Sequence, residues 1–376
     1  MKRAGCLALS LVSAGIPHLE PAMFNRASLA RNTSVGSLFS AAPPAEVPEN
    51  PALRLVAKFP IPDMTGTWDH LAGDAKSARL FLTAQDEHAI DVLDVKTGKL
   101  LHRMTGSFNR PQGQYFIPEL KRLVTSNGRD GTVRFTNTDT YEVVDTVQLT
   151  IGADLMQYDS KKKHLYIESG GKDSNRGTGK ISVVDATNGK ILGEIVTDYR
   201  AAAMALEKKR PRLYAAIPAL NQVLLVDTAK NEIVGKYDVP GRPGFIGLDE
   251  RHHRLFVSTR KHATSPAEPS FNVIDTESER RVATLPTIED TSGVAYDARH
   301  CRIYTTGLAG FVHAIQQVDP NRYETIARFP TGPHAGTSYF MPELNRFLVA
   351  VPPHETQSAE VWVFEPLPNR SGECKP

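Results

Sequence analysis

Residues 80–104 read LFLTAQDEHAIDVLDVKTGKLLHRM, and this stretch contains the pattern that decides the fold. Three short runs rich in aliphatic and β-branched residues, at 80–84, 89–93 and 100–104, are separated by polar turns. Runs of this length and composition are typical of strands, and no window has the apolar spacing of a helix. Together with a preceding strand at 70–73, the segment predicts four antiparallel strands, with a tight turn at 96–99.

The pattern recurs along the chain at intervals of 42 to 48 residues, measured from its first apolar run. The equivalent runs begin at Leu80, Leu123, Leu165, Leu213, Leu255, Ile303 and Phe347. A second marker, the polar residue that ends a β-rich run, falls at Asp94, Asn137, Asp185, Asp227, Asp275, Asp319 and Glu365. Four antiparallel strands in a repeat of this length form one blade of a β-propeller. The sequence therefore predicts seven blades.

The seventh repeat has only three strands, because Pro366 and Pro368 end it. The missing strand is predicted at the other end of the chain, where LRLVAKFP at 53–60 resembles the fourth strands of other repeats. Pairing this strand into the last blade would close the ring and remove two exposed edges. We therefore expect one all-β domain at 53–366.

The remaining segments are expected to lie outside this domain. Residues 1–40 are predicted to hold an export signal and an unstructured arm, since Lys2 and Arg3 precede a short apolar run. Residues 41–52 are predicted to be a linker and 367–376 a flexible tail. The expected location is therefore periplasmic or secreted. No segment is long and apolar enough to span a membrane.

Several blades resemble the YVTN-type β-propeller family, also called YncE-like. The resemblance rests on a Val-x-Val-Ile-Asp-x-x-Thr-Gly-Lys pattern, which is matched at 89–99, 181–190 and 223–228 and extends over about residues 53–366. It implies a propeller fold, export and a binding scaffold, but it implies no catalytic residues. WD40 signatures are absent, since Trp-Asp occurs once, at 68–69.

The charge balance favours no particular macromolecular partner. The chain has 44 Lys and Arg against 42 Asp and Glu, a formal net charge of +2, and no long basic run. Nucleic acid is therefore not expected to bind, and a monomer is expected. Cys301 and Cys374 could pair in an oxidising compartment, but a small strand-edge residue at 301 and a loose terminal thiol at 374 is the simpler interpretation.

Polar residues are expected at the channel mouth. In a propeller the first strand of each blade lines the channel, and the loops that enter it share one face. Alignment of the repeats places a set of polar residues there as the predicted ligand site: Asp69, His70, Gln112, Asp154, Tyr199, Arg200, Arg242 and His334. The two longest repeats carry their extra residues in loops on the same face, at 169–179 and 260–269.

Four histidines suggest an alternative site, because blades 1 and 7 are neighbours once the ring closes. They are His70, His88, His334 and His354. Imidazole suits Zn or Cu, but no short-spaced pair such as HxH or HExxH supports a metal site, so no cofactor is required. A divalent metal (Zn, Cu or Ca) is kept as an alternative.

The sequence thus favours a non-catalytic propeller that binds a small molecule or a protein at the mouth. A metal-dependent lactonase or lyase, and a copper-handling or electron-transfer protein, are the alternatives. No GxSxG motif or triad is visible, so the sequence does not decide whether the protein is an enzyme.

Overall fold

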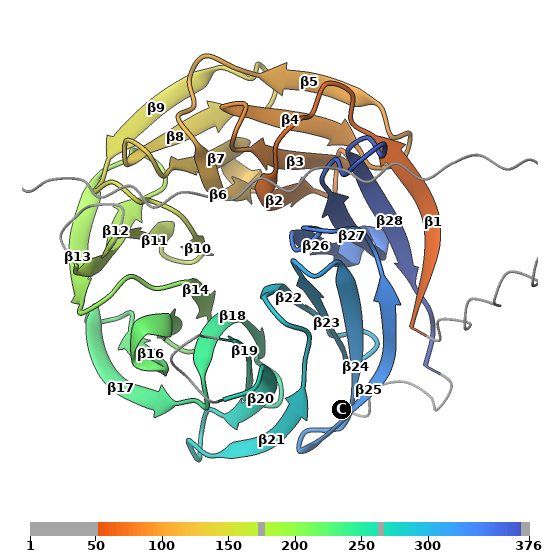
Figure 1. Cartoon of the computed structure of the whole chain (residues 1–376). Coiled ribbons are helices and arrows are strands. Elements are labelled where there is room, and N and C mark those ends of the chain that lie inside the picture. Colours follow the sequence, from red (N-terminus) through yellow and green to blue (C-terminus); the bar gives the residue numbers. More distant parts are fainter. Residues whose placement is uncertain (1–51, 172–176, 262–266, 370–376) are drawn as a thin grey trace, which may run out of the picture. The chain divides into compact units, whose positions relative to one another are not determined.

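Seven four-stranded antiparallel sheets are arranged in a ring in the computed structural model, which describes residues 52–171, 177–261 and 267–369 (Figure 1). The prediction of a seven-bladed all-β propeller is confirmed. The predicted export segment lies outside the described residues, as do the middles of the two long loops.

The two inner strands of each blade are close to the strands predicted from the repeat. The innermost strands, which contact one another around the channel, are β2 (Trp68–Asp74), β6 (Pro111–Ile117), β10 (Met156–Asp159), β14 (Ala203–Leu206), β18 (Arg242–Asp249), β22 (Thr291–Asp297) and β26 (Ser338–Met341). The second strands are β3 (Arg79–Ala84), β7 (Arg122–Asn127), β11 (His164–Gly170), β15 (Arg212–Ile217), β19 (Arg254–Arg260), β23 (Arg302–Gly307) and β27 (Arg346–Val351).

The two outer strands complete each blade. The third strands are β4 (Ala89–Asp94), β8 (Thr132–Asn137), β12 (Gly179–Asp185), β16 (Gln222–Asp227), β20 (Ser270–Asp275), β24 (Phe311–Asp319) and β28 (Glu360–Pro366). The outermost are β5 (Leu100–Met104), β9 (Val143–Gln148), β13 (Ile191–Thr197), β17 (Glu232–Asp238), β21 (Arg281–Pro286), β25 (Arg322–Pro330) and β1 (Leu53–Pro60). Three short 3-10 helices lie in turns of the described chain: η1 (Pro118–Leu120), η3 (Pro218–Leu220) and η4 (Pro342–Leu344).

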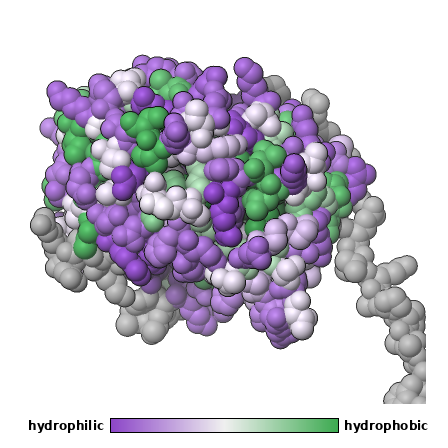
Figure 2. Space-filling view, turned by 90° about the horizontal axis from the view of Figure 1, so that it is seen from above, coloured by the Kyte–Doolittle hydropathy of each residue, from purple (hydrophilic) through white to green (hydrophobic). Residues whose placement is uncertain are grey.

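Burial explains why the second strands read as continuous apolar runs. In β3, all residues after Arg79 are buried, because both faces of the strand pack against neighbouring blades. Outermost strands instead alternate, and their first residues are often exposed apolar ones such as Leu101, Val144 and Ile191. Figure 2 accordingly shows apolar patches scattered over a largely hydrophilic surface.

The second sequence marker is a turn cap. The side chain of Asp94 accepts hydrogen bonds from the backbone N–H groups of Lys96 and Thr97, at 2.7 and 3.0 Å. Equivalent bonds to backbone N–H groups are made by Asn137, Asp185, Asp227, Asp275 and Asp319. A short polar side chain that bonds the backbone two residues on favours a tight turn, which is why the repeat keeps it between its third and fourth strands.

Neighbouring blades are joined by a repeated arginine that the sequence analysis did not single out. Arg212, at the start of a second strand, donates a hydrogen bond to the carbonyl of Thr276 in the outer turn of the next blade, at 2.9 Å. Arg79, Arg122, Arg254 and Arg302 make the same connection, to the carbonyls of Thr138, Thr187, Pro320 and Leu367. Blade 3 has His164 at this position, and Lys162 bonds Thr228 instead.

The ring closes as predicted. The fourth sheet member of blade 7 is β1, which pairs antiparallel with β28 from Leu53 opposite Pro366 to Pro60 opposite Glu360. Arg302 of blade 6 secures the junction, since its buried guanidinium donates to the carbonyls of both Ala52 and Leu367, at 2.8 and 3.0 Å. The first and last described segments are thus held together.

Two further predictions concern the cysteines and membrane-spanning segments. Cys301 is disulfide-bonded, so its interpretation as an unpaired strand-edge residue is wrong, while Cys374 lies outside the described residues. Among the described residues, no helix has the length and apolar character needed to cross a membrane.

The closure makes a direct prediction. Deletion of residues 1–61 removes β1 and exposes the edge of β28, so the free energy of unfolding should fall by about 3 kcal/mol or more. Deletion of residues 1–48 keeps β1 and all the other described strands, and is the matched control. The two proteins are compared by thermal and urea unfolding. Equal stability of the two truncations would contradict the assignment of β1 as the closing strand.

Candidate functional site

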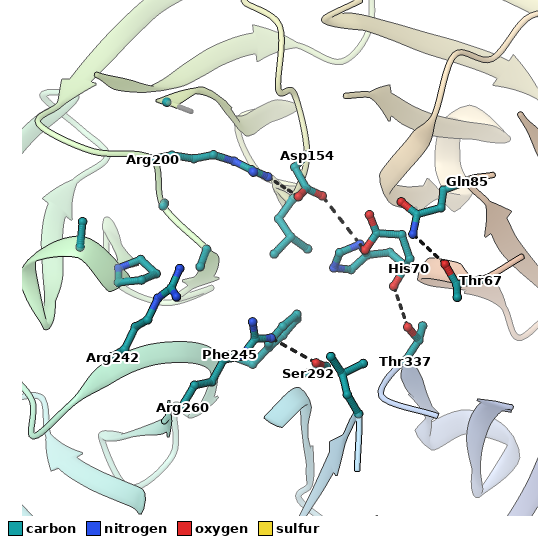
Figure 3. Close-up of a pocket in the computed structure, with 18 of the residues that line it drawn as sticks. Thr67, His70, Gln85, Asp154, Arg200, Arg242, Phe245, Arg260, Ser292 and Thr337 are labelled. Atoms are coloured by element: carbon teal, nitrogen blue, oxygen red, sulfur yellow. Dashed lines mark hydrogen bonds and ion pairs between the residues drawn. The ribbon is translucent and has the colours of Figure 1, made fainter. Parts of the chain in front are cut away.

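A cavity of about 840 Å³ opens at the centre of the ring. Its lining comes from every blade except the second, and it combines charged groups with apolar side chains such as Trp68, Leu155 and Phe245. Figure 3 shows two walls: Asp154, Arg200 and His70 on one, and Arg242, Arg260 and Phe245 on the other. The mouth therefore combines polar groups with a substantial apolar surface.

A β-bulge places Asp69 and His70 in the cavity. The pairing of β2 with β3 shifts between Trp68 and Leu71, so two residues of β2 face the single Thr83 of β3. The Thr83 hydroxyl accepts from the His70 N–H at 2.8 Å and donates to the His70 carbonyl at 3.0 Å. Bulges re-aim side chains, and this one turns two consecutive polar residues toward the channel.

Asp154 is held by close contact with blade 2. Its carbonyl accepts a hydrogen bond from the buried Ser126 hydroxyl at 2.8 Å. A Cβ atom at residue 113 would lie 2.3 Å from the same carbonyl oxygen, so only glycine allows this approach. The Asp154 carboxylate forms an ion pair with Arg200 and lies 3.7 Å from Nδ1 of His70. His70 Nδ1 also lies 3.1 Å from the Asp69 carboxylate.

Glu168 is a buried acid that the sequence analysis did not identify. It lies on β11, its side chain is 1% exposed, and its Oε1 lies 3.4 Å from Nη2 of Arg200. Oε2 of Glu168 is buried without a hydrogen-bond partner. At the fifth position of the second strand, blades 1, 2, 5 and 6 have a hydroxyl residue, namely Thr83, Ser126, Ser258 and Thr306. Blade 3 thus replaces a hydroxyl with a carboxyl. This departure from the repeat is the sequence feature from which Glu168 could have been predicted as a site residue.

Burial and mutual charge set the protonation of this group. Burial alone would lower the pKa of His70, but the charges of Asp69, Asp154 and Glu168 outweigh it and raise that pKa to about 9. Burial would raise the pKa of Asp69, yet the charge and hydrogen bond of His70 hold it below its ordinary value. Burial dominates at Glu168 and raises its pKa to about 8. Near pH 7 His70 is therefore charged and Glu168 is protonated.

The structure places most of the predicted ligand residues around the cavity. The cavity is lined by Asp69, His70, Asp154, Tyr199, Arg200, Arg242 and His334. Gln112 does not line it, and its side chain helps to hold the pKa of the Asp69 carboxyl below its ordinary value. Of the two long loops, the described ends contribute Gly171, Gly177 and Arg260.

The four histidines are dispersed rather than grouped. His70 and His334 line the cavity, but Nδ1 of His88 accepts a hydrogen bond from the Arg110 N–H at 2.9 Å. His354 is partly exposed beside Glu355. Within the described part of the chain, the group with ligand atoms close enough to hold a metal ion is Asp69, His70 and Asp154, all within 4.8 Å of one another.

Phe245 and Arg260 are further lining residues that were not predicted as ligand residues. Phe245 lies in a bulge of β18 equivalent to that in β2. Its N–H donates to the Ser258 hydroxyl, and its carbonyl accepts from the same hydroxyl. Arg260 was assigned to a long loop but lies at the end of β19. Repetition of the bulge in blade 5 would have indicated Phe245, whereas the direction of Arg260 depends on tertiary contacts.

Comparison with known proteins agrees with this architecture. No protein-family model matches the chain. Two curated relatives, both named "Uncharacterized protein YncE", from Salmonella typhimurium and Salmonella typhi, are 25% identical over 207 residues. The match covers 53% of this chain and 56% of each relative, so the chain spans about half the length of the curated relatives it matches. Together with the seven-bladed ring, this similarity supports the predicted resemblance to YncE-like propellers.

Solved structures support the fold alone. A chain of hydrazine synthase from Kuenenia stuttgartiensis superposes with a TM-score of 0.67 at 16% identity, covering 77% of this chain and 93% of that one. A chain of the mitotic checkpoint complex gives a TM-score of 0.69 at 11% identity, covering 90% and 100%. At identities this low, similarity of fold does not show that this chain shares the function of either protein.

The raised pKa values predict how stability depends on pH. Glu168 keeps its proton in the folded protein between its ordinary pKa of 4.5 and about 8, and His70 keeps its proton between 6.5 and about 9. In these windows the folded state binds more protons than the unfolded state, so stability should fall as pH rises from 6 to 9. Glu168→Gln should flatten this fall by up to about 1.4 kcal/mol per pH unit.

The measurement is the unfolding free energy of wild type and Glu168→Gln between pH 6 and 9, at constant ionic strength. Glu232→Gln is the control, since Glu232 is exposed on β17. If the Glu168 variant kept the wild-type slope, the buried protonated carboxyl would be excluded.

Proposed function

We propose that this protein is a binding propeller that captures a small molecule in its central cavity. The observation that supports this most strongly is the cavity itself, because six blades contribute charged and apolar side chains to one concave site of about 840 Å³. Small-molecule sites have volumes of roughly 300–1,000 Å³ and combine apolar walls with a few placed polar groups. A concave site of this kind suits a small ligand better than a protein surface.

The network of Asp69, His70, Asp154 and Arg200 supports a binding role more than a purely structural one. Its charges are mutually compensated, so the wall offers hydrogen-bonding groups of fixed orientation without a strong net charge. Such groups can orient a polar substituent of a ligand. A nucleophile with an adjacent base is not among the described lining residues, so no reaction is proposed from it.

Occlusion of the cavity tests the proposal. Thermal shift is used to screen wild type and Ala202→Trp against small carboxylates, amines, sugars and neutral aromatics. The substitution places an indole in the cavity lining. A compound at ten times its Kd should stabilise wild type by about 1.4 kcal/mol and raise Tm by about 3 °C. The variant should lose this shift.

Ala219→Trp, at an exposed lining position on η3, is the second variant in case Ala202→Trp does not fold. Equal shifts in wild type and a folded occluded variant would overturn cavity binding, as would the absence of any shift in wild type.

A second candidate is a divalent-cation site at Asp69, His70 and Asp154, supported by the proximity of their ligand atoms. An ion would have to displace Arg200 from Asp154 and the proton from His70, so binding should strengthen above pH 9. Equilibrium dialysis with Zn²⁺, Cu²⁺ or Ca²⁺ should then give one bound ion that Asp154→Asn loses. If wild type bound no ion, or Asp154→Asn bound as well as wild type, this candidate would be removed.

A further inference from the structure

Two arginines face each other at the edge of the cavity, and neither forms an ion pair with a described acid. Arg242 begins β18 and Arg260 ends β19, and the strand register makes them direct cross-strand partners. Both line the cavity. Like charges directly opposite each other on neighbouring strands are destabilising. Among the ion pairs of the described chain, none involves either guanidinium, whereas Arg200 on the other wall is paired with Asp154.

The Arg260 guanidinium is fixed in position by neutral groups. Its Nε donates to the Thr291 carbonyl at 2.8 Å and its Nη2 to the Ser292 hydroxyl at 3.1 Å. Gly244 leaves space for it, since a Cβ there would lie 3.0 Å from Nε. These bonds orient the side chain without neutralising its charge, and Asp290 acts on that charge without forming an ion pair with it. Burial accordingly lowers the pKa of Arg260, with Asp290 opposing and Arg242 adding to the effect.

Apolar side chains line the cavity beside Arg260. The Arg260 guanidinium lies 5.5 Å from the centre of the Phe245 ring, and Leu155 also lines the cavity. Phe245 also approaches the opposite wall, because its ring centre is 6.1 Å from that of His70. A ligand here would meet positive charge and an aromatic surface together. The wall that holds His70 and Asp154 lies opposite (Figure 3).

We infer that the cavity binds a small organic carboxylate whose anionic group bridges Arg242 and Arg260 and whose apolar body rests on Phe245. This inference depends on the proposed cavity binding and specifies its ligand class. A guanidinium offers a planar fork of donors that matches a carboxylate, and an anion between two such groups removes their repulsion. The aromatic surface favours a carboxylate with an apolar body over a bare inorganic anion.

Calorimetric titration of the full chain tests the ligand class. The probes are benzoate, phenylacetate, hexanoate and succinate, with benzamide as the neutral analogue, benzylamine as the cationic one and inorganic phosphate as the bare anion. We expect an apolar carboxylate to bind at least tenfold more tightly than benzamide, benzylamine, succinate and phosphate. Affinity should fall as salt rises from 50 to 500 mM.

Three variants separate charge from packing. Arg242→Gln and Arg260→Gln should each weaken carboxylate binding at least tenfold. Arg260→Lys, which keeps the charge but loses the fork, should weaken binding less than Arg260→Gln. Arg281→Gln is the matched control, because Arg281 is an exposed residue on β21 of the same blade, and it should bind like wild type.

The outcomes distinguish this inference from the proposed function. If benzamide or benzylamine bound as well as benzoate, and Ala202→Trp abolished that binding, the cavity would be a ligand site but not one for carboxylates. Phosphate or succinate binding as tightly as the apolar probes would overturn the role of Phe245. Arginine variants that bound like wild type would overturn the bridging role, as would the failure of every carboxylate to bind.

Discussion

The pairing of β1 with β28 is the constraint on which the rest of the structure depends. Each blade packs its apolar second and third strands against its neighbours, so an open ring would leave a blade face without a partner. Chain closure across more than 300 residues is brought about by one strand of eight residues and by the Arg302 bonds beside it. The cavity exists only because this closure holds the innermost strands around a common axis.

Within the closed ring, small departures from regular pairing create the site. The bulges in β2 and β18 occur at equivalent points, and both are fixed by a hydroxyl of the neighbouring strand. One bulge presents Asp69 and His70, and the other presents Phe245. The same scaffold therefore supplies a neutral polar wall from one blade and an apolar, cationic wall from another, without loss of the core.

Much of the fold could be predicted from the sequence, because each blade repeats a local signal. The polar residue that caps the outer turn, the Thr-Gly-Lys turn and the apolar second strand are all set by interactions a few residues apart. The closing strand was also predictable, since a missing fourth strand at one end matched a spare strand at the other. The inter-blade arginines could also have been found in the sequence, because they recur directly before the apolar run that forms the second strand of a blade.

The site was less predictable, for a physical reason. Alignment of the repeats predicts how deep in the channel a residue lies. On this basis Asp69, Asp154 and Arg242 were predicted to lie at or beside one level. Alignment does not give the direction of a long side chain. The position of Arg260 in the cavity lining and the contact of Arg200 with Glu168 were therefore not predicted. Gln112 shares that level but turns to support Asp69 rather than to line the cavity.

The central claim is that unbalanced positive charge in blade 5 makes the cavity a site for an organic anion. A crystal structure of the protein grown with benzoate tests it most directly. The claim predicts density for the aromatic ring against Phe245, with the carboxylate within hydrogen-bond distance of both Arg242 and Arg260. Benzoate bound only at the Asp69 and Asp154 wall, or only outside the cavity, would contradict it.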